Sequence, residues 1–139
     1  MTLLGAPILE GKAVDKALQA KIMDLERSVE RLSLLQAHDV LCLLKNALAM
    51  PNLLYILRTS LCAGNPLLSK FDNILRRGLS KIFNYDLTDS QWIQASLPVQ
   101  MGGLGVRSAC TLAPSAFLAS AAATLSLSIT LSCRKSYAK

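Results

Sequence analysis

The amino-acid sequence predicts a mainly α-helical bundle of five or six helices, preceded by a short β segment at the N-terminus. Three observations predict this fold class. Apolar residues recur at spacings of three and four between Val14 and Leu35, prolines stand where helices begin, and Thr88 and Gln91 have the spacing of a capping box. With 139 residues, the chain has the length of at most one domain.

The N-terminal stretch TLLGAPIL (2–9) is typical of a short strand or hairpin arm that ends near Gly11. The first helix is the clearest element, because one apolar stripe continues along it for about 33 Å. The stripe comprises Val14, Leu18, Ile22, Leu25, Val29, Leu32 and Leu35.

The pattern breaks at residues 38–39, and a second helix is expected over residues 40–50. This segment is apolar on nearly every side, which predicts that it is buried. Pro51 either ends this helix or opens the next one in its first turn, because proline has no N–H group to donate. The next helix is expected over NLLYILRTSL, residues 52–61.

Asn65 and Pro66 are typical of an N-cap followed by the first helical residue. The helix that they begin continues to residue 83, and a short capped helix follows from Asp89 to Ser96. The apolar face of the longer helix comprises Leu67, Phe71, Ile74, Leu75, Leu79, Ile82 and Phe83.

The stretch LPVQMGGLGVRS (97–108) contains three of the seven glycines. It lacks the lysine of a Walker loop and the third glycine of a dinucleotide fingerprint, so a turn between two helices is expected. A helix begins after it, at Ser108 or Thr111, and continues through Leu118. Residues 125–132 alternate with period two, which leaves helix, strand and disordered tail open.

The composition predicts that the folded chain alone would leave apolar surface exposed to water. Only 17% of the residues are charged, against about 25% in ordinary soluble domains, and 52% are hydrophobic. We expect this surface to be buried against a partner, a membrane or a missing part of the polypeptide. The net charge is +6 and all nine acids lie at or before Asp89, which is compatible with a polyanion partner without being diagnostic.

Enzymatic and metal-dependent functions find little support in the sequence. The chain has one histidine and no GxSxG motif, and His38 with Cys42 does not make a zinc site. Asp86 and Asp89 flank a helix start, where acids have a structural role. We therefore expect no catalytic residue, no metal, no cofactor and no small-molecule substrate.

The cysteines are far apart in the sequence and form no CxxC pair. This spacing is typical of reduced, mostly buried thiols in an intracellular protein, nuclear or cytoplasmic, and not of a secreted disulfide framework. The four residues are Cys42, Cys62, Cys110 and Cys133.

Basic residues form the best candidate for a functional surface. Lys70, Arg77 and Lys81 fall on one face of the helix over residues 66–83, with Arg76 beside them. Such a face could follow a phosphate backbone. From the residues alone, the solvated side of an amphipathic helix is the commoner case.

Five motifs together resemble the region that follows the polymerase palm in reverse transcriptase-like proteins of non-LTR retrotransposons. The similarity covers residues 3 to 122, and its most specific part is LP…GGLGVRSA. The motifs, in order, are LLGAPI (3–8), LLKNALAMPNLLYILRTS (43–60), FDNILRRGLSKI (71–82), WIQASLPVQMGGLGVRSA (92–109) and AFLAS (116–120).

The resemblance implies a role for each part of the chain. Residues 1–12 resemble the primer-grip hairpin, with its turn at Leu4 and Gly5, and residues 13–122 resemble the thumb. Residues 123–139 match nothing familiar. The resemblance places the four basic residues on or near a surface that faces template–primer nucleic acid.

The same resemblance predicts a catalytically inactive chain. Reverse transcription needs palm aspartates that hold two Mg²⁺ ions, and this sequence has no adjacent Asp-Asp pair. The expected function is that of a truncated remnant of an RNA-directed DNA polymerase, which binds nucleic acid weakly and without sequence preference. Two alternatives stay open, a helical protein–protein interaction module and a small protein anchored in a membrane by residues 109–133.

Overall fold

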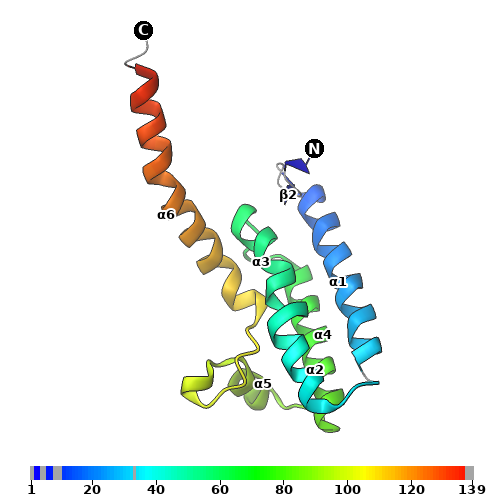
Figure 1. Cartoon of the computed structure of the whole chain (residues 1–139). Coiled ribbons are helices and arrows are strands. Elements are labelled where there is room, and N and C mark those ends of the chain that lie inside the picture. Colours follow the sequence, from blue (N-terminus) through cyan, green and yellow to red (C-terminus); the bar gives the residue numbers. More distant parts are fainter. Residues whose placement is uncertain (1, 4–5, 8–10, 33, 137–139) are drawn as a thin grey trace.

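The chain folds as a mainly α-helical bundle, as the sequence predicts (Figure 1). The computed structural model describes the backbone of residues 2–3, 6–7, 11–32 and 34–136, and the side chains of residues 11–32 and 34–125. In chain order the elements are β1 (Thr2–Leu3), β2 (Ala6–Pro7), α1 (Lys12–Leu32), α2 (Ala37–Leu43), the π-helix η1 (Leu44–Leu48), α3 (Met50–Thr59), α4 (Pro66–Phe83), α5 (Asp89–Ser96), the 3₁₀-helix η2 (Val99–Met101) and α6 (Ala109–Ser136).

The two short strands pair in antiparallel orientation, with Thr2 opposite Pro7 and Leu3 opposite Ala6. The Leu4-Gly5 turn, which the resemblance likens to a primer grip, lies outside the described residues.

The core lies between α1, α3 and α4, and the first turns of α6 pack on α3 and α4. The predicted apolar stripe of α1 is buried from Val14 to Leu32. Leu35 was expected to extend that stripe, but α1 ends at Leu32 and the side chain of Leu35 is 52% exposed. Five buried apolar residues of α4 complete the core, and burying each one contributes roughly 1.5–3 kcal/mol. They are Leu68, Phe71, Ile74, Leu75 and Leu79.

The segment after α1 departs from the predicted single buried helix. Its α-helical hydrogen bonding gives way to a wide turn at residues 44–48, where the N–H of Ala49 donates to the carbonyl of Leu44 at 2.9 Å. Val40 and Leu44 are buried, whereas the side chain of Leu43 is 42% exposed, because neighbouring helices cover only one side of the segment. The prediction of burial all round was therefore wrong.

Helix starts were predicted more accurately. Pro51 lies in the first turn of α3, which is the second of the two alternatives. The side chain of Asn65 caps α4 by accepting from the N–H of Leu67 at 2.9 Å, and its amide donates to Asp15 of α1 at 2.7 Å. The Thr88–Gln91 capping box begins α5 as predicted.

The end of α4 was predicted less well. Phe83 was expected on the buried face, but its side chain is 42% exposed. Asn84 follows it in the left-handed conformation, with φ of 50°, and ends the helix.

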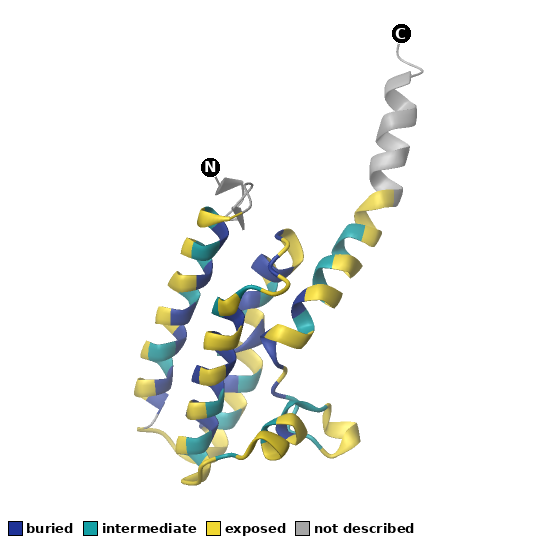
Figure 2. Ribbon diagram, turned by 180° about the vertical axis from the view of Figure 1, so that it is seen from behind, coloured by how far each residue is buried: buried dark blue, intermediate teal, exposed yellow. Residues whose placement is uncertain are grey.

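Helix α6 extends beyond the bundle (Figures 1 and 2). It begins at Ala109, directly after Ser108, and residues 125–132 belong to it, so their period-two pattern does not mark a strand. Ala109 and Ala113 are buried against the bundle, whereas Leu118 and Leu125 are 65% and 59% exposed. Large apolar side chains are also exposed elsewhere in the described part of the chain, among them Leu34, Ile93 and Met101, so α6 carries only part of the exposed apolar surface.

Residues 37–59 form one described stretch that is long and apolar enough to cross a bilayer, with a mean hydropathy of 1.6. This is weak evidence for a membrane span, because core helices of soluble proteins have the same length and composition. Part of the stretch is buried inside the bundle. The part of α6 whose side chains are described, residues 109–125, is also apolar but shorter.

Candidate nucleic-acid interface

The exposed side of α4 carries three of the four basic residues that the sequence indicates. Lys70, Arg77 and Lys81 are all exposed, and their spacings of seven and four residues place them along one face. We call these three residues the α4 basic face. The fourth residue, Arg76, is not part of this face, because its side chain contacts Leu87 and Asp89.

Acidic residues of α1 lie beside part of the α4 basic face. The guanidinium of Arg77 is 3.8 Å from the carboxylate of Glu26, and both side chains are well exposed. Such an exposed pair contributes little to stability and is screened by salt. Glu30 lines the same shallow hollow as Arg77 and Lys81, so the positive potential is reduced at this end of the face.

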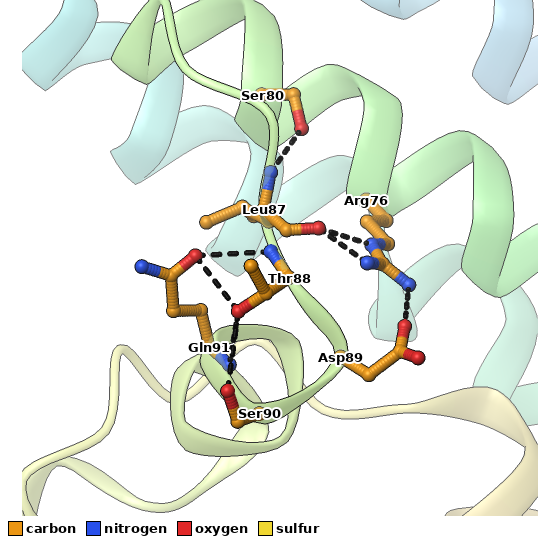
Figure 3. A network of polar contacts seen from close by, with 7 residues as sticks. All are labelled: Arg76, Ser80, Leu87, Thr88, Asp89, Ser90 and Gln91. Carbon is orange, nitrogen blue, oxygen red and sulfur yellow. Dashed lines mark hydrogen bonds and ion pairs between the residues drawn. The ribbon is translucent and has the colours of Figure 1, made fainter.

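Arg76 holds the connection between α4 and α5 (Figure 3). Its Nε and Nη2 donate to the carbonyl oxygen of Leu87, and its Nη1 is 2.6 Å from the carboxylate of Asp89. The N–H of Leu87 donates to the hydroxyl of Ser80 at 3.3 Å. The side chain of Arg76 is 28% exposed, and its contacts make it a structural clamp between α4 and the start of α5. Asp89 has the structural role predicted for it.

We expect replacement of Arg76 by glutamine to lower the free energy of unfolding by about 1.5–3 kcal/mol, because charge-assisted hydrogen bonds to a backbone carbonyl and a carboxylate are lost. Urea denaturation followed by circular dichroism measures the change. Arg77→Gln is the matched control and should change stability by under about 0.5 kcal/mol. Equal losses in the two variants would contradict the clamp.

The glycine-rich stretch forms the turn that the sequence predicts. Gly102 and Gly105 have φ of 78° and 72°, in the left-handed region that favours glycine. Consecutive amide groups of the turn donate to backbone carbonyls, so they are not available to surround a phosphate group. The pairs are Gly102 to Val99, Gly103 to Pro98, Leu104 to Ala95, Gly105 to Leu97 and Val106 to Ala95.

Asp72 is a key residue that the sequence reasoning missed. Its carboxylate is buried and accepts from the hydroxyl of Ser108 at 2.6 Å, the N–H of Ala109 at 2.7 Å and the N–H of Cys110 at 3.2 Å. It therefore binds the N-terminus of α6 to the middle of α4. The available signal was an acid within an apolar face, next to Phe71, since buried acids almost always have partners.

The predicted burial of the cysteines is wrong for two of them. Cys42 and Cys110 are exposed, Cys62 is buried, and all three are free thiols. Burial raises the pKa of the Cys62 thiol, which makes it a poor nucleophile near neutral pH. The side chain of Cys133 lies outside the described residues.

Within the part of the chain whose side chains are described, no three His, Cys, Asp or Glu residues gather closely enough to hold a metal ion. Comparisons with protein-family models, with curated proteins and with solved structures give no significant match. The resemblance to a reverse transcriptase thumb therefore stays a prediction from the five sequence motifs.

Proposed function

We propose that this chain is a catalytically inactive, thumb-like remnant of a retroelement polymerase, and that it binds nucleic-acid backbones without sequence preference. The observation that carries the binding proposal is the exposure of Lys70, Arg77 and Lys81 along one face of α4. A net charge of +6 adds a long-range attraction for polyanions. The order of the five sequence motifs supports the link to a polymerase.

The mode of binding follows from the residue types. Lysine and arginine side chains contact phosphate oxygens, which position a duplex but do not read its sequence. Three contacts release about three counterions, so the affinity for duplex should fall about 40-fold between 50 and 200 mM salt. Arg76 contributes little, because its guanidinium already has partners.

Fluorescence anisotropy with a labelled 20-base-pair duplex tests the proposal. The triple variant Lys70→Gln, Arg77→Gln, Lys81→Gln should lose most of the salt-dependent affinity. The triple variant Lys12→Gln, Lys16→Gln, Arg58→Gln is the matched control, because it removes the same charge from exposed positions elsewhere. Equal losses in both, or an affinity that salt does not change, would show that the α4 basic face is not the binding surface.

A protein–protein interaction module is the second candidate function. The exposed Leu118 and Leu125 on the projecting part of α6 favour it, because a monomer gains nothing by exposing them. Concentration-dependent sedimentation without affinity for nucleic acid would place this function first. Carbonate-resistant membrane association would instead favour anchoring by residues 109–133.

A further inference from the structure

Two further basic residues line a cleft away from the α4 basic face. The cleft has a volume of about 310 Å³ and lies where η1, the start of α3, the glycine turn and α6 meet. Lys45 and Arg107 contribute the charges, and Met50, Leu54 and Leu112 contribute apolar surface. This volume is at the lower end of the range for small-molecule sites, about 300–1,000 Å³.

The surroundings of the cleft contain little negative charge. Residues 40–71 and 90–139 include no aspartate or glutamate, and every residue that lines the cleft belongs to these two segments. Asp72 lies near this end of the bundle, but its two oxygens accept from Ser108, Ala109 and Cys110. The cleft is therefore electropositive, and its walls are mainly apolar.

The glycine turn positions Lys45. A Cβ atom on Gly105 would lie 2.9 Å from Nζ and 3.0 Å from Cε of Lys45, so the lysine side chain rests directly against the turn. The N–H of Gly105 donates to the carbonyl of Leu97 at 2.9 Å, which fixes the turn in place. Lys45 itself belongs to η1, and π-helical turns are often found at functional sites.

Both charges are available for a ligand. Among the residues whose side chains are described, neither Lys45 nor Arg107 forms an ion pair. Lys45 is half-buried and Arg107 is exposed, and both line the cleft, so an anion in the cleft can reach both side chains.

We propose that this cleft binds a small amphiphilic anion, an organic phosphate or carboxylate with a short apolar body. The charged head contacts Lys45 and Arg107, and the apolar body lies on Met50, Leu54 and Leu112. Side chains hold the head, because the amide groups of the glycine turn donate to the backbone. The site is separate from the α4 basic face and does not depend on nucleic-acid binding.

Isothermal titration of the full chain with hexyl phosphate and with hexanoate tests the proposal. At least one of these probes should bind, and the tighter one identifies the head group as phosphate or carboxylate. Lys45→Met and Arg107→Gln should each weaken that binding about tenfold or more. Arg58→Gln is the control, because it removes an exposed cation of α3 that does not line the cleft.

Several outcomes would overturn the proposal. Hexanol that binds as tightly as the better anion would remove the role of charge, and inorganic phosphate that binds as tightly would remove the role of the apolar walls. Absence of binding by both anions at millimolar concentration would exclude the site. If Lys45→Met and Arg107→Gln weakened only the binding of the duplex, the cleft would be part of the nucleic-acid surface. Circular dichroism shows whether each variant is folded. If Lys45→Met does not fold, Arg107→Gln alone tests the role of charge in the cleft.

Discussion

Replacing Asp72 with alanine is expected to lower the free energy of unfolding by about 3 kcal/mol. The change removes a buried carboxylate that accepts three hydrogen bonds and leaves the Ser108 hydroxyl and the N–H groups of Ala109 and Cys110 without their acceptor. Each unsatisfied buried donor costs about 1–3 kcal/mol, although water reaches some of them once α6 loosens. The loss of charge near the start of α6 adds to the effect.

Urea denaturation followed by circular dichroism measures this loss, and hydrogen exchange locates it. The amides of Ala109 and Cys110 should exchange faster in Asp72→Ala through local opening of α6, whereas amides in the middle of α1 should lose protection only in step with the global loss of stability. Asp86→Ala is the matched control, since it removes an exposed carboxylate from the same region of the sequence. A loss of less than about 0.5 kcal/mol in Asp72→Ala would mean that α6 does not depend on this contact.

Apolar spacing predicted the buried face of α1 up to Leu32 and that of α4 between Phe71 and Leu79, because a helix that packs on one side must repeat its apolar residues every three or four positions. It missed Leu68 at the start of α4, which is buried. Spacing does not show where a helix stops. Leu35 has the right spacing but lies after the end of α1, where the chain turns and the N–H of Leu35 donates to the carbonyl of Leu32. Residue type at the helix start was more informative, as Asn65 and Thr88 demonstrate.

Burial of the segment over residues 40–50 was not predictable from composition. An apolar segment is covered only where another element packs on it, and here that is one side, so Cys42 and Leu43 face outward. The same reasoning applies to the exposed part of α6. Composition reports how much apolar surface exists, whereas the arrangement of the helices decides which part of it is covered.

The candidate site shows a further limit of sequence reasoning. Arg76 and Arg77 are adjacent and chemically identical, yet one is a clamp and the other is exposed. The difference arises from the carbonyl of Leu87, a backbone atom that no side-chain pattern reports. Lys45 and Arg107 are 62 positions apart in the sequence, so only the fold brings them to one cleft.

Replacing Gly103 with alanine is expected to disrupt the glycine turn and cost more than about 3 kcal/mol. A Cβ atom at this position would lie 2.1 Å from the carbonyl oxygen of Leu97 and 2.7 Å from that of Gln94. These are backbone atoms, so no side-chain rotation relieves the clash and the turn itself must move. That movement also breaks hydrogen bonds of the neighbouring amides, including the one from Leu104 to Ala95.

Gly102→Ala separates this steric effect from backbone conformation. Gly102 has φ of 78°, but a Cβ atom there would meet no non-neighbouring atom within 4 Å, so alanine should cost only about 1–2 kcal/mol of conformational strain. Urea denaturation gives the free energy of unfolding of both variants. A decrease in Gly103→Ala no larger than in Gly102→Ala would contradict the close contact between residue 103 and the carbonyl of Leu97. Because the turn supports Lys45 through Gly105, Gly103→Ala should also weaken anion binding in the cleft, whereas Gly102→Ala should preserve more of it.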